Sequence, residues 1–247
     1  LQELLQTVWA EKLKIIGMSS VLTVLVVFWA ISLPNEYRAE ALLKPNSNEQ
    51  SSPLSSLAGQ FGGLASLAGI NLGGQSVDKV QYALEVIKSK KFLYQFIAEN
   101  DLYVPLMAAK GWDLNSNKLI INEKTYDEIS SVWIRDTHPP RTPKPSNFET
   151  YESFLKNNLS VSTDKNSGMV KISVTHYDPY FAKELVNKLV EAINLTIKNE
   201  DLIEANDSIK FLTKELENTD VSDMKSMFYT LIEQQQQTIL LTNVRDD

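Results

Sequence analysis

The hydrophobic positions near the start of the chain form one continuous run, with no charged residue from 15 to 35. Residues 15–33 read IIGMSSVLTVLVVFWAISL. At about 1.5 Å per residue, a helix over this run spans about 28 Å, close to the apolar thickness of a bilayer. Trp29 and Tyr37 lie near one end, where amphipathic rings favour the membrane interface. We therefore expect a transmembrane helix at 15–33, and its representative anchor positions are Ile15, Leu22, Val26, Trp29 and Leu33.

Two other interpretations of this run stay open. A core helix of this length usually carries a polar face, and a cleaved signal peptide has a shorter apolar region. Lys12 and Lys14 lie closer to the run than Arg38 and Lys44 on the other side, so the positive-inside rule favours a cytoplasmic segment at 1–14. The rest of the chain contains no comparable run and is expected on the far side of the inner membrane, in the periplasm of a bacterium.

Short elements of mixed type follow between 34 and 178, and we interpret them as one α/β base domain. Alternation predicts strands, and helical spacing predicts helices. The expected strands are 37–43, 119–121, 159–162 and 169–174, and the expected helices are 77–100 and 148–155. Ser89 is expected to cap the second half of the first of these helices. The four prolines of 138–145 predict an extended polyproline segment.

A glycine-rich loop occupies 55–74, which reads SSLAGQFGGLASLAGINLGG. It lacks the lysine and the spacing of a phosphate-binding loop, and its polar and small residues leave too little apolar surface for a membrane span. Apolar residues such as Phe61 and Ile70 recur about every third position, which a slack linker does not need. We expect this loop to become ordered on assembly, by packing on its own or a neighbouring subunit's base domain.

The pattern from 179 to the end is helical, and neither glycine nor proline occurs after Pro179. Asp178 and Pro179 form a favoured helix start. Apolar residues recur every three or four positions, and the later part of the series is typical of a coiled-coil seam. A break at 218–220 predicts a tip, with Asp220 as the N-cap of a returning helix. The residues expected to pack the hairpin and neighbouring copies are Ile209, Leu212, Leu216, Phe228 and Leu231.

A helix of about 40 residues would run about 60 Å, which is too long for the interior of a small domain. The predicted fold class is therefore α+β: a membrane-anchored chain with an N-terminal transmembrane helix, a periplasmic α/β base domain at 34–178, and a long protruding antiparallel helical hairpin at 179–247. The seam needs partners, which we expect to be the returning helix and other copies of the chain. A bent helix folded back on its own domain is the alternative.

Composition excludes several kinds of chemistry. The chain has 247 residues, a net charge of -7 and no cysteine, so thiolate chemistry is excluded and nucleic acid is a poor partner. Its two histidines, His138 and His176, are far apart, and no GxSxG motif occurs, so we expect no metal site, no catalytic triad and no cofactor. We predict that the protein is not an enzyme.

Three basic residues, Arg135, Arg141 and Lys144, flank the proline-rich segment and could bind an anionic glycan. A solvated loop is the simpler interpretation of this charge. Trp112 and Trp133 could stack on sugar rings, although such residues more often belong to a core.

The order of the motifs carries more information than any one of them. After the anchor come a strand, the small-residue loop, an α/β region, SGMVKISV at 167–174 leading into YDPYFA at 177–182, and EQQQQT at 233–238. This order resembles that of the bacterial polysaccharide chain-length determinants, also called Wzz-type polysaccharide co-polymerases. The resemblance implies an inner-membrane protein, in contact with membrane lipid, whose periplasmic part forms a homo-oligomeric ring. Such rings act with a membrane polymerase and lipid-linked glycan to set the length of O-antigen, enterobacterial common antigen or capsule chains.

Members of this family normally carry a second, C-terminal membrane helix, which is missing between Leu1 and Asp247. We therefore expect a partial chain, and the periplasmic part of a polysaccharide-export tyrosine kinase stays open as an alternative. A membrane-anchored periplasmic adaptor of an export machine would share the hairpin. A glycan hydrolase or transferase is the enzyme alternative, and the sequence offers no convergent catalytic site for it.

Overall fold

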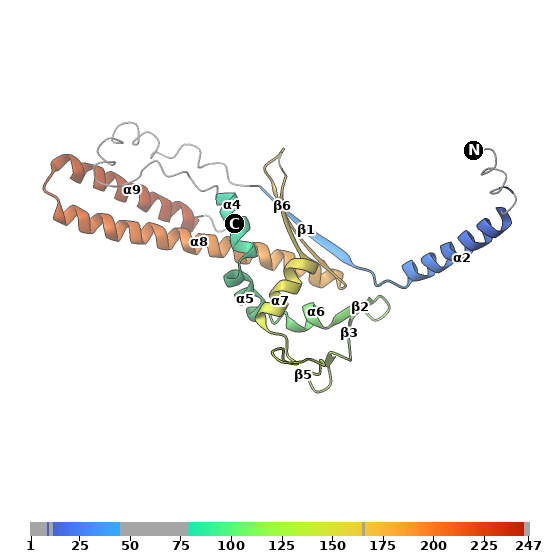
Figure 1. Cartoon of the computed structure of the whole chain (residues 1–247). Coiled ribbons are helices and arrows are strands. Elements are labelled where there is room, and N and C mark those ends of the chain that lie inside the picture. The colour runs from blue at the N-terminus through green and yellow to red at the C-terminus, as the bar shows by residue number, and fades with distance from the viewer. Residues whose placement is uncertain (1–8, 10–11, 45–78, 165, 245–247) are drawn as a thin grey trace.

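The computed structural model describes residues 9, 12–44, 79–164 and 166–244. The fold is α+β, with an apolar helix near the N-terminus, a base domain around a small sheet, and a hairpin of two long helices (Figure 1). In this view the apolar helix and the hairpin tip lie at opposite ends of the molecule. The predicted glycine-rich loop at 55–74 lies outside the described residues.

The apolar helix, α2 (Lys12–Ile31), is long and apolar enough to cross a membrane. It ends two residues before the predicted end at Leu33, because the N–H groups of Ser32 and Leu33 close a turn on carbonyls at 28–30 before Pro34. Its described side chains are not buried against the rest of the structure; Val26 and Trp29, for example, are 53% and 65% exposed. The alternative of a buried core helix is therefore wrong for the described part of the chain.

The central sheet is antiparallel, with the strand order β1-β7-β6. The bounds agree with the predicted strands to within two residues: β1 (Tyr37–Leu43), β6 (Leu159–Thr163) and β7 (Val170–His176). Tyr37 pairs with His176 at one end of the sheet and Leu43 pairs with Val170 at the other. Gly168 closes the β6–β7 turn with a φ of +69°, a conformation that suits glycine.

The core of the base domain lies between the sheet and the helices. The predicted break at Ser89 is confirmed, because its Oγ accepts a hydrogen bond from the N–H of Phe92 at 3.2 Å. The helices around the core are α4 (Lys79–Lys88), α5 (Lys90–Glu99), α7 (Asn147–Ser153) with a π-helical turn η1 (Phe154–Asn158), and the start of α8 (Pro179–Asn218). The large apolar side chains that are most deeply buried are Ile87, Leu93, Ile97, Phe154, Val174, Leu185, Val186 and Leu189.

The segment between α5 and α7 contains more structure than the sequence pattern predicts. The strand expected at 119–121 is confirmed as β3. The elements are α6 (Tyr103–Met107), the hairpin of β2 (Ala109–Asp113) with β3 (Lys118–Ile121), and the hairpin of β4 (Tyr126–Asp127) with β5 (Val132–Trp133). The prediction of an extended polyproline segment is wrong for 138–141, because the Arg141 N–H donates to His138 O at 3.0 Å, which closes a turn.

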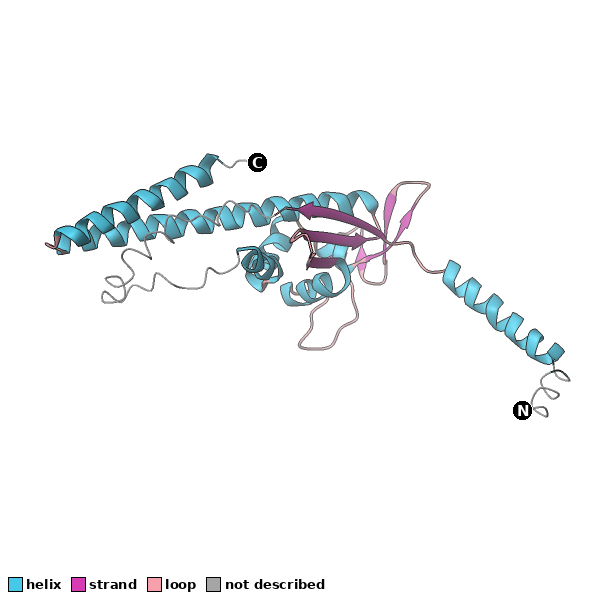
Figure 2. Ribbon diagram, turned by 90° about the horizontal axis from the view of Figure 1, so that it is seen from above, coloured by secondary structure: helices cyan, strands magenta, loops and turns pink. Residues whose placement is uncertain are grey.

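The hairpin consists of α8, a continuous helix of 40 residues, and α9 (Ser222–Val244) of 23 residues. The first half of α8 covers the sheet, and its second half extends away from the base domain with α9 alongside it (Figure 2). The alternative of a helix bent back on its own domain is therefore wrong. The prediction of Asp220 as N-cap is also wrong, since α9 begins two residues later and the Asp220 carboxylate lies 3.9 Å from Lys225 Nζ.

Candidate functional site

The base domain fixes the direction in which the hairpin leaves it. The carboxylate of Asp178 accepts hydrogen bonds from the N–H groups of Tyr180 at 2.8 Å and Phe181 at 3.1 Å. Pro179 occupies the first helical position, where its missing N–H costs nothing. The predicted start of the long helix is thus confirmed. Further along, the Tyr82 hydroxyl of α4 donates to Glu200 Oε2 at 2.9 Å, a bond that raises the pKa of Tyr82 and holds α8 near the end of the base domain.

A second, smaller hydrophobic cluster holds the two helices of the hairpin together. Its buried members are Leu212 of α8 and Met227, Phe228 and Leu231 of α9, and its half-buried members are Leu216, Met224 and Ile232. Four of the five positions expected to pack the hairpin therefore lie in this cluster. Ile209 is half-buried and lies outside it. A role of these residues in contacts between copies stays a prediction.

Sequence reasoning missed Met227 and Ile232. A narrow seam of one apolar residue every three or four positions accounts for Phe228 and Leu231 but not for their neighbours. In the structure α9 buries a wider apolar stripe, as helices of globular proteins do. The adjacent apolar pairs Met227–Phe228 and Leu231–Ile232 in the sequence indicate this wider stripe.

Large apolar side chains also remain on the outside of the hairpin. Each is more than half exposed: Ile203, Phe211, Val221, Tyr229, Leu240, Leu241 and Val244. At about 100° per residue, Tyr229, Leu240 and Val244 lie within about 60° of one another around α9. Two helices that bury one apolar stripe and expose another offer a surface to a further partner.

Among the three basic residues proposed for glycan contact, Arg135 is already engaged. Its Nε donates to the carbonyl oxygen of Pro143 at 2.7 Å, and its Nη2 donates to that of Thr142 at 3.0 Å. The same guanidinium lies 3.5 Å from Glu149, and the Arg135 side chain is only 15% exposed. The pKa of Glu149 is lowered, chiefly by the hydrogen bond from the Ser146 N–H. Arg135 therefore fastens the proline-rich loop to the start of α7.

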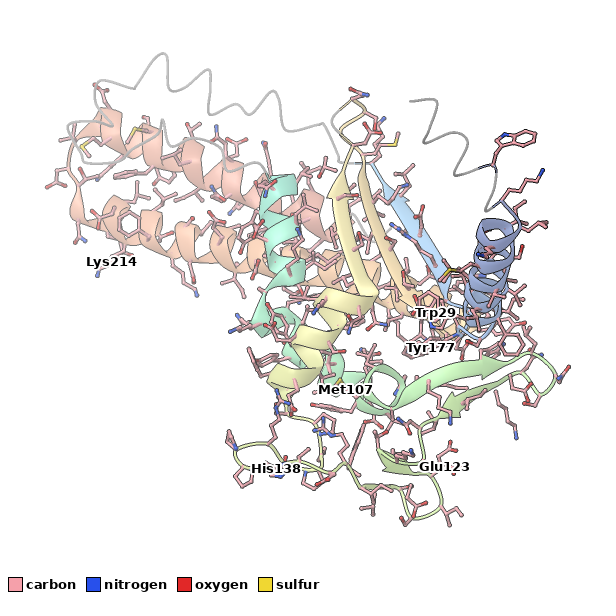
Figure 3. All side chains as sticks on the ribbon, turned by 45° about the vertical axis from the view of Figure 1, so that its right-hand side comes forward. Trp29, Met107, Glu123, His138, Tyr177 and Lys214 are labelled. Atoms are coloured by element: carbon pink, nitrogen blue, oxygen red, sulfur yellow. The ribbon has the colours of Figure 1, made fainter. Side chains whose placement is uncertain are left out.

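The other two basic residues are exposed on the same loop, which also carries His138 (Figure 3). Arg141 is 72% exposed and lies 3.8 Å from Glu149. Lys144 is exposed, and its Nζ lies 5.4 Å from the centre of the Tyr103 ring. The three residues therefore do not form one open basic patch, and a glycan contact through Arg141 and Lys144 stays a prediction.

The two tryptophans proposed for sugar stacking lie apart from each other in different hairpins. Trp133 of β5 packs edge-to-face on Tyr126 with ring centres 5.0 Å apart. Trp112 of β2 packs against Tyr180 of α8, with ring centres 6.1 Å apart. Within the described residues, no group of three or more acidic or histidine side chains could hold a metal ion.

The comparison with known families concerns the N-terminal part of the chain, which contains α2, β1, α4 and α5. Residues 1–100 match the Wzz family, chain length determinant protein. The resemblance inferred from the motif order is thereby confirmed over these residues. The Wzz family is membrane-associated, and its members regulate polysaccharide chain length without catalysing a reaction. A search of curated proteins found no match to the chain. The hairpin lies beyond the residues that match Wzz, so its role is argued from its geometry.

Proposed function

We propose that this protein sets the length of a bacterial surface polysaccharide as a non-catalytic partner of a membrane polymerase. In this proposal α2 crosses the inner membrane with its N-terminus in the cytoplasm, and the base domain and hairpin stand in the periplasm. The polymer would be an O-antigen, enterobacterial common antigen or capsule chain carried on a lipid. The Wzz match over 1–100, which covers the apolar helix and the strand that follows it, supports this role.

The proposal that the protein forms an assembly rests on the exposed apolar surface of the hairpin. The cluster around Leu212 and Phe228 already joins α8 to α9, so Tyr229, Leu240 and their exposed neighbours are left for another molecule. Copies arranged side by side around an axis would each bury the stripe of the next, and such contacts close into a ring. We therefore propose that the hairpins of a homo-oligomer form its wall.

A ring of this kind would act by position and not by chemistry. Several copies of the base domain would hold polymerase molecules and lipid-linked glycan close together, which raises their effective concentration. Release of the growing chain would then depend on the geometry of the assembly. This account needs neither a metal nor a nucleophile.

Deletion in the native bacterium tests the proposal. We expect the gel ladder of the surface polysaccharide to change from a clustered length to a broad, mostly short distribution. The wild-type chain should restore the clustered length, whereas a chain carrying Tyr229→Asp and Leu240→Asp should not. A matched control, Lys214→Ala on an exposed position of α8, should restore it. An unchanged ladder for every surface polymer would exclude the proposed function.

A further inference from the structure

The β2–β3 hairpin lies at the end of the base domain from which α2 leaves, in both Figure 1 and Figure 2. Only five residues separate Ile31, the last residue of α2, from Tyr37 of β1, a span of at most about 20 Å. Tyr37 pairs with His176, next to the start of α8, and Tyr180 in the first turn of α8 contacts Trp112 of β2. Chain connection and contacts therefore place this hairpin beside the exit of the apolar helix.

The side chains at this end have the composition of a membrane interface. Leu114 stands at the tip of the β2–β3 hairpin and is 63% exposed, and Tyr180 is 66% exposed. Trp112 is half-buried against Tyr180, and Lys110 and Lys118 are exposed on the same hairpin. Aromatic rings with a polar tip favour the headgroup layer, and lysines reach its phosphates while their stems cover apolar surface.

The negative charge at the tip is held within the turn. Asp113 accepts hydrogen bonds from the Ser116 hydroxyl at 2.6 Å and from the Asn115 N–H at 3.0 Å. These bonds lower the pKa of Asp113 and hold its carboxylate toward the following residues. An exposed leucine in a hydrogen-bonded turn, flanked by lysines, is suited to shallow insertion beneath phosphate headgroups.

We propose that the tip of the β2–β3 hairpin, Leu114 with Trp112 and Tyr180 beside it, rests in the headgroup layer of the bilayer that α2 crosses. The inference rests on the anchoring of α2 that the proposed function includes. A second contact with the membrane fixes the tilt of the base domain, which a single helix on a five-residue connection leaves free to swing. Figure 3 shows Trp29 of α2 and Tyr177 at this same end of the molecule.

The absence of cysteine from the chain makes a site-specific test direct. In four separate variants, a single cysteine replaces Leu114, Leu22, Ile129 or Val221. Leu22 belongs to the anchor, Ile129 is 99% exposed in the turn of the β4–β5 hairpin, and Val221 lies at the tip of the long hairpin. The full chain, labelled with a fluorophore, is reconstituted in phosphatidylcholine and phosphatidylglycerol vesicles that carry a nitroxide either on the headgroup or deep in the acyl chain. Far-ultraviolet circular dichroism checks that each labelled chain is folded.

We expect the headgroup nitroxide to quench the label at Leu114→Cys several-fold more than the labels at Ile129→Cys and Val221→Cys. The deep nitroxide should quench the label at Leu22→Cys. A label at Asn115→Cys should lose most of its headgroup quenching when Leu114→Asp is added.

Quenching at Leu114→Cys no greater than at Val221→Cys, with Leu22→Cys still quenched, would overturn this inference and leave the proposed function intact. Retained quenching in the Leu114→Asp chain would also overturn it, because the leucine would then not make the contact. Failure of the deep nitroxide to quench Leu22→Cys would instead contradict the anchoring itself. The polysaccharide ladder of the deletion strain reports on the proposed function independently.

Discussion

His176 Nε2 donates a hydrogen bond to the carbonyl oxygen of Pro105 at 2.9 Å, and its Nδ1 accepts one from the N–H of Asp178 at 3.0 Å. Nδ1 must accept because it faces a backbone N–H, so the proton of the neutral ring lies on Nε2. The side chain is only 3% exposed. One imidazole thus joins the end of β7 to α6 and to the residue that caps α8.

The first prediction concerns pH. Burial lowers the pKa of His176 below its ordinary value, and the Pro105 carbonyl and the carboxylates of Asp178 and Glu36 offset only part of this effect. As the pH falls, the unfolded chain therefore binds the proton before the folded chain does. We expect the free energy of unfolding to decrease as the pH falls below about 6.5, the ordinary value for histidine. Thermal unfolding of the full chain in detergent, followed at a series of pH values, measures this.

His176→Gln keeps a donor for Pro105 but does not titrate. We expect this variant to unfold at a lower temperature at neutral pH and to lose less stability on acidification than the parent chain. His138→Gln, on the exposed proline-rich loop, serves as the matched control for the loss of one imidazole. The same fall of stability with pH in His176→Gln would contradict the prediction.

Adjacent residues of α8 should separate hairpin packing from assembly. Leu212→Asp places a charge in the cluster between α8 and α9, and we expect it to destabilise the hairpin by about 3–5 kcal/mol. Phe211→Asp changes an exposed position, so the hairpin should lose less than about 1 kcal/mol. Hydrogen exchange of α9 measures the first effect, and mass photometry in detergent measures assembly. Both variants should assemble less than the parent, but only Leu212→Asp should expose the α9 amides. Undiminished assembly in Leu212→Asp would show that the hairpin cluster does not support it.

Removal of the Arg135 guanidinium should loosen the proline-rich loop. Arg135→Ala leaves the carbonyls of Pro143 and Thr142 without this donor, and we expect a loss of about 1–2 kcal/mol in unfolding experiments. Arg135→Lys should recover only part of the loss, because one ammonium group does not reproduce the planar fork. Arg141→Ala, at an exposed position, should leave stability unchanged. Equal stability of Arg135→Ala and the parent would show that the loop holds its shape without this contact.

The amide oxygen of Gln234 is buried in α9 without a hydrogen-bond partner among the described residues. Gln234→Leu removes this unsatisfied acceptor and adds apolar surface next to Leu231, so the hairpin should gain about 1 kcal/mol. Thermal unfolding of the dissociated chain in detergent measures the gain, with Gln236→Leu at an exposed position as the control. A lower unfolding temperature for Gln234→Leu would contradict this prediction, because it would show that the amide already makes a stabilising bond in the dissociated chain.

Periodicity over several turns, or over a whole strand, made the larger elements predictable. The strand at 37–43 and the start of α8 at Pro179 follow from alternation and from a capping aspartate, which act locally. Among the strands of the β2–β3 and β4–β5 pairs only β3 was predicted, because strands this short give too few positions for alternation to be recognised. Their turns depend on single side chains, such as the Asp127 carboxylate that accepts a bond from the Ile129 N–H.

The residues of the candidate site were likewise predictable only where a local pattern determines them. The hairpin positions follow from the helical period, so Leu212 and Phe228 could be named in advance. The role of Arg135 could not, because the carbonyls that it binds come together only once the loop has turned at His138–Arg141. A positive charge in the sequence does not reveal which acceptors the folded chain will present to it.

The unbroken course of α8 limits how such a chain can gain or lose residues. Leu189 in its first half belongs to the core of the base domain, and Leu212 in its second half belongs to the hairpin cluster. One residue inserted between them would rotate one buried face by about 100° relative to the other, whereas seven residues would bring the two faces back to within about 20°. With a matching insertion in α9, the reach of the hairpin would change in increments of about 10 Å. Natural length variants of this hairpin are therefore expected to differ in discrete steps.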